Sequence, residues 1–318
     1  MDREKIAGIT PEQIRAFRLR AHHLDRKLPP GALETAASVC GFQNSPPGAW
    51  ETALWNRVEG CTLQAAQDAL YREKRLLQAW SVRLLPLVFP AAESGVFLAP
   101  LAAAAGETPW IYTRGITAAL DFLGMAFDDL LPLVLQAAEY LETHTVTRKE
   151  ALDTALAEIA EAALPAEKLP LWRAPSMYGP RQTVGGAVVS FMLRPCAFRF
   201  RVVFGARDGI HPTFTSFRRW TGHMPAVPPD AEKRLVQKFL HAHGPADVSA
   251  FRSAHAHSGR RHSPSRAVWG LTGRRRYGII TSRYYDKARR GLPPPLSRGR
   301  TGARNPLERG CLFHEALQ

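Results

Sequence analysis

Cysteine is scarce in this chain, and its spacing excludes several kinds of protein. The four cysteines among 318 residues are Cys40, Cys61, Cys196 and Cys311, and no two of them form a CxxC pair. That spacing predicts neither a disulfide framework nor a structural zinc site, and it fits a reducing compartment. The histidines also lack carboxylates or thiols at ligand spacing, so we predict no metal and no cofactor.

Long apolar runs and nucleotide-binding motifs are also missing. No apolar stretch approaches the roughly 18 to 20 residues of a membrane-spanning helix. The charged start of the chain does not resemble a secretory signal. The sequence contains no P-loop, no GxGxxG in a βαβ context and no GxSxG. We therefore expect a cytoplasmic protein, associated with the nucleoid, that needs no small-molecule cofactor.

Acidic residues are too few to balance the basic ones, but only near the C-terminus. The chain has 42 Lys and Arg against 28 Asp and Glu, a net charge of +14. From Phe251 onward there are 15 basic and 3 acidic residues, or +12, which leaves 27 and 25 for the first 250 residues. The whole-chain charge is therefore weak evidence for the partner of those first 250 residues.

Helix signals dominate the first 160 residues. Thr10-Pro11-Glu12-Gln13 predicts an N-cap followed by a first-turn proline. Further helices are expected over residues 33–40, 49–58 and 62–70. Residues 76–89 are rich in Leu and Val and predict a strand pair or wing. Short helices followed by a small β element are typical of a winged helix.

The same order of helices and strands is predicted to recur. Thr147-Arg148-Lys149-Glu150 has the pattern of a capping box before an apolar helix. Residues 188–204 nearly alternate, as a β-rich stretch does. A tight turn is expected at Arg207-Asp208-Gly209 and a returning strand over residues 213–220. A third helical unit is expected to begin near Asp230.

These patterns predict a mainly α-helical protein with small β elements (α+β), built from tandem winged-helix units and a β-rich unit. We expect a winged-helix unit over residues 1–110, a second helical or winged-helix unit over 111–170, a β-rich unit over 171–228, and the start of a third winged helix over 229–251. Residues 252–318 allow three interpretations: a basic arm that follows phosphates, a disordered tail, or the product of a shifted reading frame.

Several segments match, in order, the landmarks of one known family. They are residues 18–24 (RLRAHHL), 40–48 (CGFQNSPPG), 53–60 (ALWNRVEG), 79–83 (AWSVR) with 88–90 (VFP), 172–176 (WRAPS) and 239–245 (FLHAHGP). Together they resemble the AlkZ-like winged-helix DNA glycosylase family over roughly residues 10–250. The resemblance implies tandem winged helices and a β-rich unit around duplex DNA. It also implies hydrolysis of the N-glycosidic bond of alkylated or crosslinked nucleotides.

The family's active-site motif, Gln-x-Gln or Gln-x-Asp, corresponds here to Gln43-Asn44-Ser45. By this resemblance Gln43 is expected to position the water that attacks C1′, with Asn44 and Ser45 in support. Glutamine cannot ionise, so it orients water through hydrogen bonds. An alkylated purine leaves readily, so positioning matters more than a strong base. Alternatively, Gln43 caps the preceding helix, and residues 46–48 are only a rigid turn.

The sequence departs from the family's pattern at and near the motif. Ser45 stands at the second motif position, and Leu87 stands where many relatives carry His. Leu84 and Leu85 stand where Gly and a small residue are common. These departures favour a protein that binds DNA without chemistry.

Basic residues in three places are candidate DNA contacts, and each is equally well explained as a solvated or paired surface cation. The candidates are Arg15, Arg18 and Arg20 on the first helix, Arg83 in the apolar β segment, and Arg199 and Arg201 on one face of a predicted strand pair.

We therefore expect a helix-turn-helix, DNA-binding protein of DNA repair, a monofunctional DNA glycosylase and hence a hydrolase. Its expected partner is duplex DNA that contains damage, and its oligomeric state is not predicted. Two alternatives stay open. One is a non-catalytic winged-helix protein with an architectural or regulatory role. The other is a truncated or frame-shifted remnant, for which residues 252–318 are the evidence.

Overall fold

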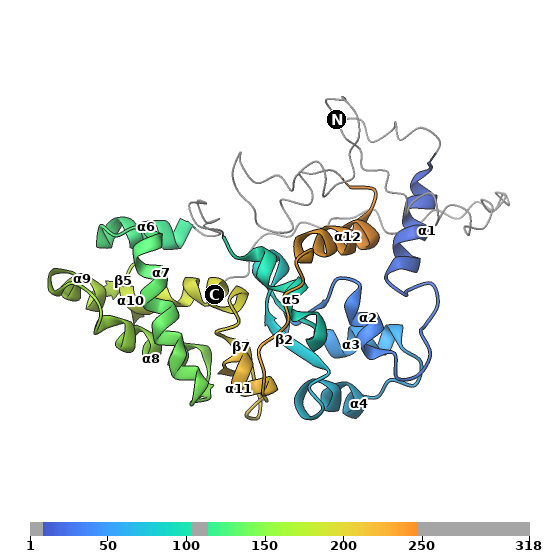
Figure 1. Ribbon diagram of the computed structural model, residues 1–318, viewed down its shortest axis with the longest axis horizontal. Helices are drawn as coiled ribbons and strands as arrows, with labels where there is room; N and C mark the ends of the chain where they lie inside the picture. Colours follow the sequence, from blue (N-terminus) through green and yellow to red (C-terminus); the bar gives the residue numbers. More distant parts are fainter. Residues whose placement is uncertain (1–8, 104–113, 247–318) are drawn as a thin grey trace.

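The computed structural model describes residues 9–103 and 114–246, which fold into helices and three small antiparallel sheets (Figure 1). The predicted mainly α-helical fold with small β elements is therefore confirmed. Over the residues searched, no helix has the length and apolar character needed to cross a membrane. Residues 252–318, on which the remnant interpretation depends, lie outside the described residues.

The first unit runs from α2 to β3 and follows the N-terminal helix α1 (Pro11–Ala21). Its elements are α2 (Leu33–Ser38), β1 (Phe42–Gln43), α3 (Ala49–Arg57), α4 (Leu63–Gln67), the π-helical turn η1 (Asp68–Arg72), β2 (Leu76–Trp80), the turn η2 (Val82–Leu84) and β3 (Pro86–Pro90). The strands form one sheet in the order β1-β3-β2. The helices and the strand pair expected here are confirmed.

Local hydrogen bonds explain where these helices begin. Oγ1 of Thr10 accepts from the backbone N–H of Gln13 at 3.2 Å, and the Gln13 side chain accepts from the Thr10 N–H at 3.0 Å. Pro11 takes the first helical position, where no N–H is needed. Thr62 caps α4 by accepting from the N–H of Ala65 at 3.1 Å. Both caps satisfy first-turn N–H groups that have no partner within the helix.

The second unit runs from α7 to β8 and follows α6 (Arg114–Leu123). Its elements are α7 (Phe127–Ala137), η5 (Ala138–Glu142), β4 (Val146–Thr147), α8 (Lys149–Glu161), η6 (Ala166–Lys168), α9 (Leu169–Arg173), the hairpin β5 (Pro175–Ser176) and β6 (Gly179–Thr183), α10 (Val184–Phe198), β7 (Val203–Phe204) and β8 (Thr213–Thr215).

The two units repeat one topology. In each, a helix and a short strand precede two further helices and a hairpin. The sheet orders are β1-β3-β2 and β4-β8-β7, so in both units the last strand lies between the first and the second. The second unit differs by the insertion of α9 and the β5–β6 hairpin between its last two helices.

The expectation of a β-rich stretch over residues 188–204 is wrong. α10 is a helix capped by Thr183, whose Oγ1 accepts from the N–H of Gly186 at 3.0 Å. The strand content of the stretch is limited to β7, at its end. Buried residues occupy nearly every face of α10, so its sequence is apolar all round. Such a sequence lacks the 3.6-residue period that separates a buried helix from a buried strand.

Two smaller expectations also need correction. The predicted capping box at residues 147–150 is absent, because Arg148 is the N-cap of α8, with φ 71° and no side-chain cap bond. The helix itself is present. The returning strand ends at Thr215, and the chain then forms the helix α11 (Phe217–Thr221), which Ser216 caps.

The last described helix is α12 (Ala231–His243), the helix expected near Asp230. η3 (Ala91–Glu93), α5 (Ser94–Phe97) and η4 (Ala99–Leu101) connect the two units. α12 packs against both α5 and α1 (Figure 1). The two ends of the described chain therefore meet beside the first unit.

Candidate functional site

Gln43 lies at the edge of the first sheet with its side chain exposed. β1 pairs with β3, which places Gln43 opposite Leu87. Nε2 of Gln43 donates to the carbonyl oxygen of Ser45 at 2.9 Å. This contact is to the turn that follows, so Gln43 does not cap α2. Its Oε1 makes no hydrogen bond with the described residues and keeps its capacity to accept.

Asn44 is buried, with 7% of its surface exposed. Its Nδ2 donates to Oε1 of Gln78 at 3.1 Å, and its Oδ1 accepts from the N–H of Gly48 at 2.7 Å. Its backbone N–H donates to the carbonyl of Pro86 at 2.8 Å. Asn44 therefore holds the turn after β1 to β3 through its backbone and to β2 through its side chain, while Ser45 remains exposed. The role of Gln78 was not foreseen, although one glutamine inside an apolar strand is a signal for it.

The leucines that depart from the family's pattern belong to packing. Leu87 is 7% exposed and lies in the core beneath the first sheet, and Leu84 packs against that core. Leu85 is half-buried. Leu84 and Leu87 therefore serve packing on one side of the first sheet.

Arg83 lies in the connection between β2 and β3 rather than within a strand. Its backbone and that of Leu84 are left-handed, with φ of 59° and 61°. Its side chain is exposed, and it forms no hydrogen bond with the described residues. Its charge is close enough to His243 to contribute to the lowered pKa of that imidazole. Arg83 therefore adds positive charge at the same end of the sheet as Ser45.

Arg18 ties α1 to the C-terminal end of α12. Its guanidinium donates to the carbonyl oxygens of His243 at 2.8 Å and Gly244 at 3.1 Å. Nε2 of His22 donates to the carbonyl of Ala242 at 3.1 Å. Cations are stabilising at a helix C-terminus, where carbonyl groups carry partial negative charge. We call this contact the α1–α12 junction, and in it Arg18 has an internal structural role.

The two other arginines of α1 differ from Arg18. Arg15 is exposed and forms no hydrogen bond or ion pair with the described residues. Nε of Arg20 lies 3.3 Å from the carboxylate of Asp25. Surface pairs of this kind are weak, so Arg20 can exchange its partner.

The ionisable groups beside β1 are held neutral. The α1–α12 junction gathers four histidines whose pKa values are lowered, mainly by burial and then by neighbouring positive or imidazole groups: His22, His23, His241 and His243. The pKa of His243 falls to about 4. Sγ of Cys40 lies 3.6 Å from Nε2 of His243, and burial raises the pKa of that thiol to about 11. At neutral pH the positive charge here comes from arginines and lysines.

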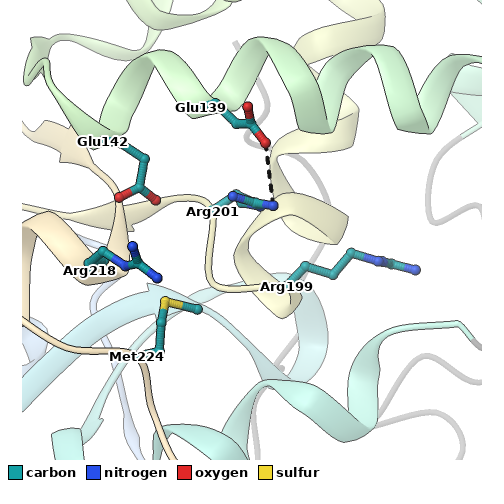
Figure 2. A pocket seen from close by; sticks show the side chains of 6 residues that line it. All are labelled: Glu139, Glu142, Arg199, Arg201, Arg218 and Met224. Atoms are coloured by element: carbon teal, nitrogen blue, oxygen red, sulfur yellow. Dashed lines mark ion pairs between the residues drawn. The ribbon is translucent and has the colours of Figure 1, made fainter.

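Arg199 and Arg201 are not on a strand pair. Arg199 is the C-cap of α10 and Arg201 precedes β7, because the predicted strand is a helix. Both line a pocket of about 530 Å³ that is completed by Glu139, Glu142, Arg218 and Met224 (Figure 2). Each of the two guanidinium groups already has one oxygen partner within the protein. Nη2 of Arg199 donates to the Ala103 carbonyl at 3.1 Å, and Nη2 of Arg201 lies 3.5 Å from the Glu139 carboxylate.

The predicted site residues therefore fall into two groups. Gln43, Ser45 and Arg83 lie at the first sheet, with α1 beside them across the junction. Arg199 and Arg201 belong to the second unit, in a pocket whose further arginine, Arg218, was not predicted. Among the described residues no cluster of histidine, cysteine or carboxylate groups could hold a metal ion.

A family described as DNA glycosylase AlkZ-like has a model that matches residues 36–299. Among solved structures, the Streptomyces sahachiroi DNA glycosylase AlkZ matches with a TM-score of 0.60 and 20% sequence identity. The match covers 82% of this chain and 65% of the Streptomyces protein, so this chain spans less than two thirds of the length of that protein. At this identity the likeness concerns the fold. No protein among the curated sequences compared matches the chain.

Proposed function

The chain belongs to the AlkZ-like DNA glycosylase family, and from that premise we propose that it binds duplex DNA and hydrolyses the N-glycosidic bond of an alkylated or crosslinked nucleotide. Gln43 is the residue that positions the attacking water. The observation that carries this assignment is the exposed amide of Gln43, held by one hydrogen bond and free at its acceptor oxygen.

The repeated topology supports tandem winged helices. Helix, strand, two helices and a hairpin, with the last strand central, is the element order of a winged helix. We propose residues 1–110 as the first winged helix. The segments 111–170 and 171–228 together contain the second, since its first strand lies in one segment and its hairpin in the other. α12 begins a third unit over residues 229–251.

The chemistry follows from the positions of the polar groups. Oε1 of Gln43 and the hydroxyl of exposed Ser45 accept hydrogen bonds from one water molecule, which orients its lone pair toward C1′. Asn44 acts through the backbone, because its buried amide holds the turn that carries both side chains. A purine alkylated at N7 is already cationic and leaves as the neutral base, so the glycosidic bond breaks before the water has bonded to C1′ and a fixed water suffices. As its oxygen bonds to C1′, the water gives one proton to bulk solvent. The neutral thiol and imidazoles nearby are not needed as bases.

Exposed arginines supply the contacts to the DNA backbone. Arg83 lies at one end of the first sheet, and Arg15 and Arg20 lie on α1, so phosphates along these surfaces would meet guanidinium donors. Arg18 contributes by fixing α1 in place. Arg199 and Arg201 serve a second phosphate contact at the pocket of Figure 2.

Base release from a duplex that contains N7-methylguanine tests this function. The wild-type protein releases the free base, and Gln43→Ala lowers the single-turnover rate about a hundredfold or more while leaving duplex affinity unchanged. Ser45→Gln restores the family's second glutamine and raises the rate. Base release that survives intact in Gln43→Ala would show that another residue positions the water.

A non-catalytic DNA-binding role is the second candidate. It is favoured by Ser45, whose side chain is shorter than glutamine and carries a single hydroxyl. This candidate is selected if the wild type and Ser45→Gln both bind the duplex at saturating protein and neither releases the base.

A further inference from the structure

The most exposed large apolar side chain in the described part of the chain is Ile210, at 88%. It lies at the tip of the β7–β8 hairpin, where polar residues and glycine are usual. Asp208 and His211 exchange both backbone hydrogen bonds at 3.0 Å, so Gly209 and Ile210 form a two-residue loop. Gly209 has a φ of 59°, which matches a turn with glycine at its first central position. The predicted turn at residues 207–209 is thus present, and it presents an isoleucine.

The hairpin is rigid below its tip. The N–H of Gly205 donates to the Thr213 carbonyl at 2.9 Å, and Oγ1 of Thr213 donates to the Ala206 carbonyl at 2.5 Å. Nη2 of Arg148 donates to Nε2 of His211 at 3.1 Å, which ties the tip to the start of α8. A side chain on such a support loses little conformational freedom when it inserts into a partner.

One cation lies beside the exposed isoleucine. Arg148 is exposed, and it donates to His211 next to the tip. Arg207 instead turns toward the first unit: its Nη2 is buried, and its charge opposes the burial that raises the pKa of the Tyr71 phenol. The hairpin therefore presents an apolar tip beside an exposed arginine.

In the second unit the hairpin is better placed to reach DNA than the helix before it. In a winged helix the helix before the hairpin ordinarily enters the major groove. Here that helix is α10, and 11 of its 15 residues are buried. Its burial beneath the rest of the second unit prevents such entry.

We propose that the β7–β8 hairpin is a wedge that inserts Ile210 between stacked bases of the bound duplex, while Arg148 holds a flanking phosphate. Proteins that kink DNA use apolar side chains in this way, because unstacking a base step is offset by contact with the side chain. This inference rests on the proposed binding of duplex DNA. It adds that the duplex is distorted by a hairpin far from Gln43 in the sequence.

The test uses the full chain and a duplex that carries 2-aminopurine, whose fluorescence rises when it is unstacked. The wild type raises the fluorescence on binding. Ile210→Gly abolishes the rise and weakens binding roughly tenfold, the factor expected for losing one buried aliphatic side chain. The dependence of affinity on salt stays the same, because phosphate contacts are unchanged. Ile210→Leu retains the rise.

Two controls separate the wedge from other effects. Phe122→Ala removes a similarly apolar side chain, 45% exposed on α6, and leaves the fluorescence rise intact. Arg148→Gln lowers the salt dependence by about one phosphate contact and keeps the rise. Unchanged binding and fluorescence in Ile210→Gly overturn the wedge while the proposed function stands. A wild type that binds no duplex overturns both. Loss of self-association in Ile210→Gly, with DNA binding unchanged, assigns the tip to a contact between copies and overturns the wedge.

Discussion

The two units share one topology but differ in where they carry polar groups. In the first unit, the edge strand β1 exposes Gln43, and a buried amide pair, Asn44 and Gln78, supports it. In the second unit, the corresponding strand β4 carries half-buried Val146 and Thr147. The comparison shows that the fold is a scaffold and that chemistry depends on which side chains a unit leaves exposed.

The second unit also has a buried charged network where the first has neutral amides. Asp153 is 4% exposed, its carboxylate lies 2.7 Å from Nζ of Lys149, and Lys149 also donates to Ser190. Burial raises the pKa of Asp153 to about 6, although Lys149 opposes the shift. The network lies between α8 and α10, so it supports the packing of these two helices.

The largest effect should come from the packing of α10. Gly185→Ala lowers the free energy of unfolding by about 1–3 kcal/mol, because the added Cβ would collide with the indole of Trp172. Gly186→Ala is the matched control, since its Cβ meets the flexible side chain of Gln182 at 3.2 Å. Denaturant unfolding measures both. Equal destabilisation by the two variants would show that α10 is not packed as described.

Next in size is the loss of the Asn44 side chain. Asn44→Ala leaves Gln78 and the N–H of Gly48 without partners and lowers the free energy of unfolding by about 1–2 kcal/mol. Base release falls as well, because the turn that holds Gln43 loosens. The double variant with Gln78→Ala should be less destabilised than the sum of the single variants. Additive losses would argue against the direct contact.

The α1–α12 junction and the second unit should respond oppositely to acid. The folded pKa of His243 lies below its unfolded value, so unfolded chains bind more protons and stability is lost as pH falls from about 6.5 toward 4. Asp153 has a raised folded pKa, so its contribution improves as pH falls from about 6 toward 3.8. Thermal midpoints against pH should flatten in His243→Gln and steepen in Asp153→Asn. An unchanged profile in both variants contradicts this assignment.

The smallest effect is expected from one exposed arginine. Arg15→Gln should weaken duplex binding a few-fold and reduce the slope of log affinity against log salt by about 0.9, the value for one phosphate contact. Fluorescence anisotropy over a salt series measures this slope. Arg173→Gln, on α9 and paired with Glu161, is the matched control and should leave it unchanged.

The residues of the Gln43-Asn44-Ser45 motif could be predicted from the sequence, but which of them are buried and which are exposed could not. The motif placed Gln43, Asn44 and Ser45 together, and the strand pair after them was predicted because its apolar pattern and length are local features. That Asn44 is buried and Gln43 exposed depends on how β1 meets β3 and β2. The arginines 199 and 201 were assigned to a strand because a helix buried on nearly all faces has no period to reveal it.

Local sequence patterns were enough to predict the starts of several helices, the order of helices and hairpins in the first unit, and the concentration of positive charge after residue 250. Each depends on residues a few positions apart, as the cap of Gln13 by Thr10 does. Tertiary structure alone decided that Arg18 serves a helix end 225 residues away, that α10 is buried and that Ile210 is exposed. These outcomes depend on which surfaces pack together, and packing joins residues whose separation in sequence carries no local signal.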